Sequence, residues 1–210
     1  MPPTAARRVT ERRPLPRRSY AVGRERRQQI LMAAHEFFSS QGFRGASMRD
    51  VATRVGLTLP GLLHHFPSKE ALLEGVLQER DDTDTPWFLN KWEETGSFRQ
   101  AMKELVRRNL ENREMVQLFT TLSAEATDPG HPAHDYFKGR YEESRELFSR
   151  TLATARRRGE ARAGASGPVL IAVMDGLQVQ WLLDPEFDFL GQLDRYLDTI
   201  LIDEPPKKKK

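Results

Sequence analysis

Residues 47–73 read SMRDVATRVGLTLPGLLHHFPSKEALL, and their pattern predicts two short helices joined by a turn. Ser47 is the expected N-cap of the first helix, because its hydroxyl can accept a hydrogen bond from a free backbone N–H, and Asp50 completes a capping-box-like spacing. Gly56 stands where a left-handed residue ends a helix, and Thr58 is a second candidate N-cap. The stretch therefore predicts a helix-turn-helix.

The second short helix is expected to run to Phe66 and to be followed by a connecting helix. Pro60 lies in its first turn, where the missing N–H has no intrahelical partner in any case. Phe66 and Pro67 end the helix, and Ser68 is the expected N-cap of the next one. Four apolar residues then recur at helical spacing and predict a buried face: Leu72, Leu73, Val76 and Leu77.

A further helix is predicted upstream, from Arg24 to Gln41, and Gly42 is expected to end it. Its apolar face is expected to pack under the helix-turn-helix and consists of Ile30, Ala33, Ala34, Phe37 and Phe38. Residues 1–23 are rich in Arg and Pro with little to bury, which predicts a disordered basic arm. Two interpretations of its arginines stay open: contact with phosphates or a minor groove, and a solvated extension.

This region resembles the DNA-binding domain of the tetracycline-repressor (TetR) family of bacterial regulators. The resemblance covers roughly Arg24 to Leu77 and rests on Phe43, Gly45, Ser47, Arg49, Val51, Ala52, Val55, Gly56 and the run HHFPSKEALL. It implies an all-α protein in which an N-terminal three-helix DNA-binding domain is joined by a connecting helix to a C-terminal helical ligand-binding and dimerisation domain, with about nine helices. The expected divisions are a basic arm (1–23), the DNA-binding domain (24–70), the effector-binding and dimerisation domain (71–203) and a basic tail (204–210).

The charges of the 210-residue chain are unevenly distributed. Residues 1–70 hold 13 Lys and Arg against 5 Asp and Glu, whereas residues 71–206 hold 16 against 25, and four lysines follow. A basic N-terminal third suits a phosphate-binding surface. The absence of cysteine from the sequence excludes disulfides and thiolate metal sites within it, and the N-terminus lacks the apolar segment of a secretory signal; a cytoplasmic location is expected.

Downstream, the sequence predicts a series of helices. The connecting helix is expected to end or kink between Thr83 and Pro86. Ser97 and Gln100 form a capping box for the next helix, and Asp128-Pro129-Gly130-His131-Pro132 is a turn. Helices are predicted at about 97–113, 114–127, 133–158, 167–184 and after Pro185. Residues 167–184 are apolar on more than one side, so that helix is expected to face its own core and a partner; it is too short and too polar to span a membrane.

The resemblance implies DNA contacts from Arg24, Arg27, Ser47, Arg49, Thr58, Leu59, Pro60, Leu63, His64 and Lys69. Leu59 and Pro60 have side chains that cannot hydrogen-bond, so they are expected to contact thymine methyl groups. Arg49 is expected to bind guanine, and a phosphate contact or a surface salt bridge remains the alternative for it. Leu63 stands where many members carry a phosphate-contacting Tyr. The expected partner is double-stranded DNA with a palindromic operator, bound by a homodimer whose recognition helices lie about 34–36 Å apart.

The resemblance also implies a small-molecule effector pocket and a dimer interface built from the last two helices. Candidate effector-binding residues are Trp87, Trp92, Met115, Phe119, His134, Tyr141, Met174 and Trp181. Candidate dimerisation residues are Val169, Val173, Leu177, Trp181, Leu190, Leu193 and Leu197. Occupancy of the pocket is expected to change the spacing of the two DNA-binding domains and release the operator, which makes the protein a transcriptional repressor.

Two other functions remain as alternatives. A ligand-binding dimer without specific DNA binding is suggested by Leu63. A metal-dependent enzyme would use His131, His134 and Asp135, but no HExxH motif, nucleophile elbow or phosphate-cradling loop accompanies them. The prediction is therefore of a protein without catalytic residues, bound metal or cofactor. The identity of the effector, the operator and the regulated genes does not follow from the sequence.

Overall fold

The computed structural model describes residues 17–202, and within that range the chain forms nine α-helices and one isolated bridge between Ala161 and Leu201. The predicted all-α fold is confirmed. The helices are α1 (Arg17–Gly45), α2 (Met48–Arg54), α3 (Leu59–His65), α4 (Lys69–Thr95), α5 (Phe98–Glu111), α6 (Arg113–Glu125), α7 (His134–Arg157), α8 (Gly167–Leu183) and α9 (Phe189–Ile200).

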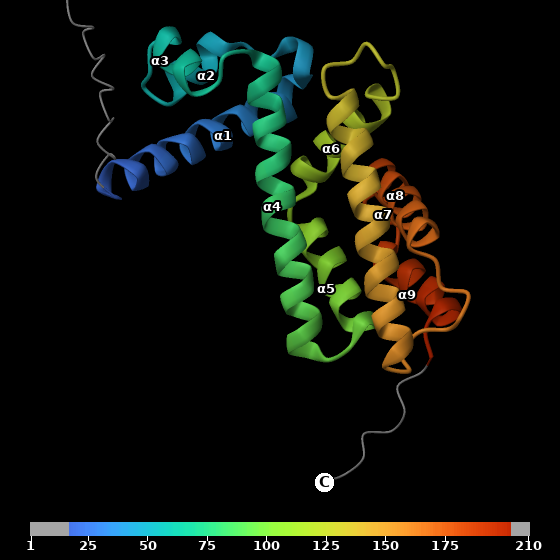
Figure 1. Cartoon of the computed structure of the whole chain (residues 1–210). Coiled ribbons are helices and arrows are strands. Elements are labelled where there is room, and N and C mark those ends of the chain that lie inside the picture. The colour runs from blue at the N-terminus through green and yellow to red at the C-terminus, as the bar shows by residue number, and fades with distance from the viewer. Residues whose placement is uncertain (1–16, 203–210) are drawn as a thin grey trace, which may run out of the picture.

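The long helix α4 connects two groups of helices (Figure 1). At one of its ends α1 crosses it and, with α2 and α3, forms an N-terminal three-helix unit. Along the rest of α4 lies α5, and α7, α8 and α9 complete a helical domain around them. Because α1 also contacts α6, the three-helix unit is attached to the helical domain at two places.

The predicted caps of the helix-turn-helix are confirmed. The Ser47 Oγ accepts a hydrogen bond from the Arg49 N–H at 3.2 Å, the Thr58 Oγ1 accepts one from Gly61 at 3.2 Å, and the Ser68 Oγ accepts one from Ala71 at 3.1 Å. Gly56 has a φ of +65°, the left-handed conformation expected at the turn. Local polar groups therefore set where α2, α3 and α4 begin.

The first hydrophobic core joins the three-helix unit to the helical domain. Leu62 and Phe66, at the end of α3, are buried against apolar residues of α1 and α4. The same cluster continues through Leu118 and Phe119 of α6 to Phe137 of α7. The position of α3 is consequently fixed by a core that reaches into the helical domain.

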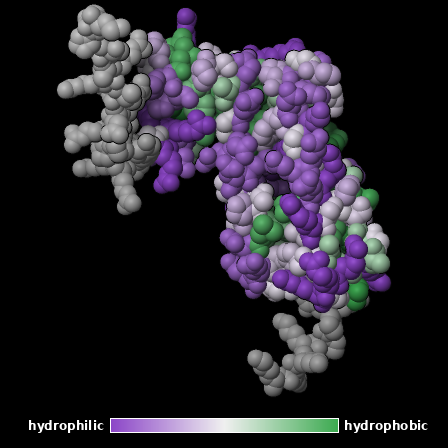
Figure 2. Space-filling view, viewed as in Figure 1, coloured by the Kyte–Doolittle hydropathy of each residue, from purple (hydrophilic) through white to green (hydrophobic). Residues whose placement is uncertain are grey.

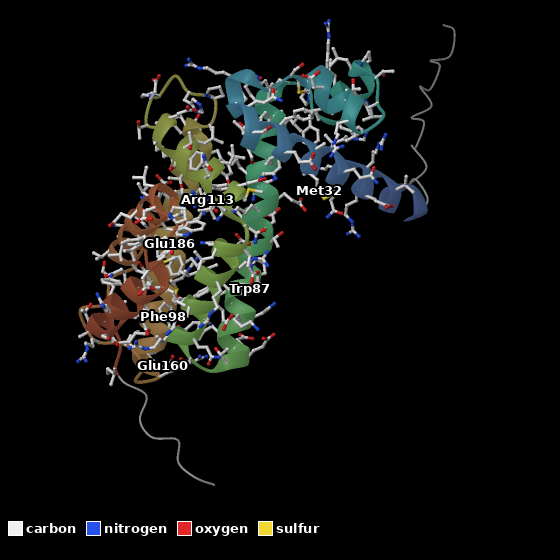
Figure 3. The ribbon with its side chains drawn as sticks, turned by 180° about the vertical axis from the view of Figure 1, so that it is seen from behind. Met32, Trp87, Phe98, Arg113, Glu160 and Glu186 are labelled. Carbon is white, nitrogen blue, oxygen red and sulfur yellow. The ribbon has the colours of Figure 1, made fainter. Side chains whose placement is uncertain are left out.

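A second core fills the far end of the helical domain. Trp92 of α4 packs edge-to-face on Phe98 at a ring separation of 5.6 Å, and residues of α8 and α9 close over them. Glu160 lies beside Phe98 at this end (Figure 3), where its Oε2 accepts a hydrogen bond from the Phe98 N–H at 2.9 Å. A carboxylate at the N-terminus of α5 favours the helix dipole.

Two predicted helix limits are wrong. α4 does not end between Thr83 and Pro86 but continues to Thr95 and ends at Gly96, whose φ is +65°. Proline costs a helix about 3 kcal/mol, and burial of Phe88 and Trp92 beyond it offsets this cost. α1 begins at Arg17, ahead of the predicted start, so residues 17–23 of the predicted disordered arm are helical; Arg17, Arg18 and Ala21 favour helix there.

Other predicted limits are met within a few residues. Gly42 has a φ of +70° and interrupts the helical geometry of α1, as its position predicted. Ser97 accepts a hydrogen bond from the Gln100 N–H at 3.3 Å, and Gly159, which follows α7, has a φ of +78°. The predicted basic tail and the first sixteen residues of the predicted arm lie outside the described residues.

Gly75 of α4 packs closely against α1 and against the Phe66 ring. A Cβ at Gly75 would lie 2.7 Å from the Phe66 ring and 3.0 Å from the Leu31 side chain. We therefore expect Gly75→Ala to lower the free energy of unfolding by about 1–3 kcal/mol, despite the better helix propensity of Ala. Urea denaturation followed by circular dichroism measures the change.

Gly139, within α7, provides the matched control, since nothing lies within 4 Å of its added Cβ. Gly139→Ala is expected to raise the free energy of unfolding by up to about 1 kcal/mol. Equal stability of the two variants would contradict the role given to the contact at Gly75.

Candidate nucleic-acid interface and helical-domain cavity

The outer face of α3 presents an unusual mixture of apolar and histidine side chains. Pro60, Leu63 and His64 are exposed, and Leu63 keeps 39% of its surface accessible. Leu59 is half-buried. Leu62 is buried in the core, so Pro60 and His64 lie on the opposite, exposed side of the helix with Leu63 beside them, whereas Leu59, three residues before Leu62, lies nearer the core.

Arg49 of α2 is exposed, and among the described residues its guanidinium has no hydrogen bond or ion pair. Arg54, on the same helix, differs: its guanidinium pairs with Glu36 of α1 at 2.9 Å. An exposed arginine without a protein acceptor keeps five N–H donors for another partner. Arg49 is thus the one of these two arginines whose hydrogen-bonding capacity remains unused within the described chain.

Four other predicted DNA contacts take part in intramolecular contacts. The Lys69 ammonium donates to the Arg44 carbonyl at 3.1 Å and lies 4.8 Å from the centre of the Phe43 ring. The Arg27 guanidinium lies over the Phe66 ring at 4.3 Å. The Ser47 hydroxyl caps α2, as described above. Arg24 and Thr58 are exposed, and the Thr58 hydroxyl caps α3.

The histidines of the 128–134 turn hold the turn together. His134 contacts the Ala126 carbonyl through Nδ1 at 2.8 Å. The His131 Nδ1 accepts from the Ala133 N–H at 3.2 Å, and its ring packs on Phe43. Asp135 is exposed in the first turn of α7. Across residues 17–202 we find no group of three or more His, Asp or Glu side chains suited to a metal ion.

A cavity of about 380 Å³ lies inside the helical domain, with walls from α4, α5, α6, α7 and α8. Of the predicted effector-binding residues, Phe119, Tyr141 and Met174 line it. Met115 lines a second cavity, of about 610 Å³, which lies between α1, α4, α5 and α6. Arg80, Asp84 and Asn109 belong to the walls of both, so the two spaces adjoin.

Four predicted effector-binding residues lie outside both cavities. Trp92 packs on Phe98, and His134 closes the turn. Trp181 lies under the Arg113 guanidinium at 5.0 Å, while Arg113 donates to the Leu182 carbonyl at 2.7 Å. Trp87 lies near Arg108. Figure 3 shows Arg113 and Trp87 on separate helices of the domain. Large aromatic residues have their usual role in the core here.

The cavity wall carries charged residues that the sequence pattern did not indicate. The Arg80 Nε donates to Asp84 at 3.1 Å, and the Arg140 Nε donates to both oxygens of Asp81, at 3.0 and 2.9 Å. Both guanidinium groups lie over the Phe119 ring, at 4.1 and 5.2 Å. Burial lowers the pKa of Arg80, since a charged group loses hydration there.

Asp175 of α8 also faces this cavity. It accepts a hydrogen bond from the Tyr141 hydroxyl at 2.8 Å. Burial raises the pKa of Asp175 and, together with the neighbouring carboxylate, raises the pKa of Tyr141 to about 12. One turn on, the Gln178 amide donates to Thr120 at 2.7 Å. In the sequence, Asp175 is the one charged residue of residues 167–183.

The predicted dimerisation residues divide between surface and core. Val169 keeps 50% of its surface accessible, and Val173, Leu177 and Leu190 are half-buried. Trp181, Leu193 and Leu197 are buried within the protomer, so they are not free to contact a partner; their prediction as interface residues is corrected. The reason is that α9 packs on both α5 and α8, which uses its apolar stripe.

α8 nevertheless leaves apolar side chains at the surface. Val179 and Leu183 are exposed on it together with Val169. Figure 2 shows hydrophobic residues gathered along the edge formed by α8 and α9, on a face that is otherwise largely hydrophilic. None of the helices in residues 17–202 has the length and apolarity needed to cross a bilayer. An exposed apolar surface of this kind is typical of a protein interface.

Comparison with known proteins finds relatives of one kind. The family model of the bacterial regulatory proteins, tetR family, matches residues 30–76. The HTH-type transcriptional repressor KstR2 of Rhodococcus jostii is 32% identical over 108 residues, which are 51% of this chain and 46% of that relative. The HTH-type transcriptional regulator TtgR of Pseudomonas putida is 25% identical over 195 residues, 87% of this chain and 93% of that protein.

The fold is similar to that of a solved TetR-family structure. The crystal structure of a TetR-family transcriptional regulator from Rhodococcus sp. superposes with a TM-score of 0.72 at 22% identity, covering 85% of this chain and 100% of that one. The KstR2 match spans less than half of that relative's length. The matched helix-turn-helix and the shared helical architecture agree with each other: residues 30–76 match the bacterial regulatory proteins, tetR family, and the chain has the fold of a solved TetR-family regulator.

Proposed function

We propose that the protein is a DNA-binding transcriptional regulator, a repressor that a small-molecule effector releases from a palindromic operator. The observation that carries this proposal is the outer face of α2 and α3, where Arg49 has no partner among the described residues and Leu63 is exposed. A functional DNA-binding domain at 24–70, an effector-binding and dimerisation domain at 71–203 and a cytoplasmic location are parts of the same proposal.

The cavity in the helical domain supports the effector-binding part of the proposal. Its volume of about 380 Å³ falls in the range of small-molecule sites. Arg80 and Asp84, in its wall, belong to α4, the helix that also carries the three-helix unit. A ligand that prefers one position of α4 would change the population of DNA-competent dimers.

Arg49 is the first residue to test. We expect Arg49→Ala to weaken binding to the selected operator by about 1–3 kcal/mol and to relax selection of one G·C pair, because a bidentate contact to guanine is lost. Selection of bound sequences from a random duplex library, followed by fluorescence anisotropy at two salt concentrations, measures both effects.

Arg54→Ala is the matched control, because that guanidinium already pairs with Glu36. We expect its operator preference to match that of the wild-type protein. If the wild-type protein enriches no sequence and shows only salt-sensitive retention, specific DNA binding is excluded and the alternative of a ligand-binding dimer without an operator takes its place.

The apolar side chains of α3 give a separate prediction. Leu59 and Pro60 are proposed to contact thymine methyl groups, and we extend this proposal to Leu63, which is 39% exposed on the same helix. Replacing one contacted thymine by uracil removes only the methyl group, and we expect an affinity loss of about 1 kcal/mol or less for the wild-type protein. Leu63→Ala should show no such loss at the thymine that Leu63 contacts. If replacing thymine by uracil lowers the affinity of the wild-type and Leu63→Ala proteins equally at every position, the proposed methyl contact of Leu63 is contradicted.

The homodimer is proposed to form through the exposed face of α8 with Leu190 of α9. Val179 is 41% exposed on that face, and burying a charge there without a partner is costly. We expect Val179→Asp to convert the dimer into monomers in analytical ultracentrifugation. Gln117→Asp, at an exposed position of α6, is the control and should remain dimeric. A dimeric Val179→Asp protein would place the interface elsewhere.

A further inference from the structure

The cavity of the helical domain contains a carboxylate, Asp175, that has a tyrosine partner but no cationic one among the described residues. We propose that Asp175 binds a positively charged nitrogen of the effector, so that the ligand is an amine or quaternary ammonium compound with an apolar or aromatic body. The inference rests on the proposed function, since it names the chemical class of the effector of that cavity.

An inventory of the charged groups leads to Asp175. Asp84 is bound by Arg80 at 3.1 Å and by Arg108 at 3.0 Å, and Asp81 is bound by Arg140. Arg108 is one-third exposed, so solvent screens the charge that it adds. The two half-buried guanidinium groups of the wall, Arg80 and Arg140, therefore each have a carboxylate partner, whereas Asp175 lies farther than 4 Å from every described Lys, Arg and His.

The surroundings of Asp175 make a cation favourable. Its one hydrogen bond, from the Tyr141 hydroxyl, leaves further lone pairs of the carboxylate for a ligand. Burial raises its pKa even though Arg140 acts in the opposite direction, which means that the ionised form lacks compensation. A ligand cation would supply that compensation through a charge-assisted hydrogen bond or direct ion pairing.

The apolar part of the wall suits the body of such a ligand. Phe88 and Phe148, whose rings are 5.5 Å apart, line the cavity together with Phe137, Met174 and Ile171. Aromatic faces attract a desolvated cation as well as apolar groups. A carboxylate ligand fits less well: Arg80 and Arg140 already pair with Asp84 and Asp81, and these acids would repel a further anion.

The test compares three probes that share one phenylbutyl body: 4-phenylbutylamine, 4-phenylbutan-1-ol and 4-phenylbutyrate. Ligand-observed NMR titration of the full chain gives their dissociation constants. We expect the amine to bind about tenfold or more tightly than the alcohol, as an ion pair in a partly desolvated site predicts. In Asp175→Asn, which keeps an acceptor for Tyr141, that preference should disappear.

Glu143→Gln is the matched control, since Glu143 also lines the cavity but is exposed. It should keep the preference for the amine, and so should Tyr141→Phe, which retains the Asp175 carboxylate. Thermal unfolding and circular dichroism of each variant separate loss of the site from loss of the fold.

Three results would overturn the inference: an amine preference that survives in Asp175→Asn, tightest binding of 4-phenylbutyrate, or no binding of any probe up to about 10 mM. Tightest binding of 4-phenylbutyrate would indicate that Arg80 and Arg140, and not Asp175, bind the charged group of the ligand. Operator selection without probes tests the proposed function separately. If the protein binds a specific DNA sequence but shows no preference for the amine, only the proposal of a cationic effector is refuted. If it shows an Asp175-dependent preference for the amine but selects no DNA sequence, only the proposal of a DNA-binding regulator is refuted.

Discussion

The packing of Phe66 against α4 is the contact on which the rest of the structure depends. Its ring fits against Gly75, where an added Cβ would lie 2.7 Å away, and the Arg27 guanidinium covers the ring at 4.3 Å. One side chain thereby joins the end of α3, the start of α4 and the middle of α1. Since buried side chains are packed as tightly as crystals, small changes at this point move α3 as a unit.

α4 extends this constraint into the helical domain. Gly75, against which Phe66 packs, lies near the start of α4. The ion-paired residues Arg80, Asp81 and Asp84 lie in its middle, and Trp92 lies near its end. These ion pairs are half-buried, so desolvation opposes much of their attraction and they stabilise the fold little. These ion pairs lie beside the cavity of the helical domain, and α4 provides the physical link from this region to α3.

The sequence predicted most of the local structure because short-range groups determine it. Ser47, Thr58 and Ser68 cap helices through their own hydroxyls, and Gly56 takes the left-handed conformation that other residues avoid. The failed limit at Pro86 has the opposite cause: a local helix breaker was overruled by burial of Phe88 and Trp92, which is a tertiary effect.

The sequence by itself determined the all-α fold, the helix-turn-helix and its exposed residues, because periodicity and capping act within a few residues of each other. Only the tertiary structure decided which side chains line the cavity. It brought Arg80, Arg140 and Asp175 from three helices to one wall, placed Trp92 and Trp181 in the core, and buried Leu193 and Leu197 within the protomer. Those outcomes depend on helices far apart in the chain, whose packing no local pattern specifies.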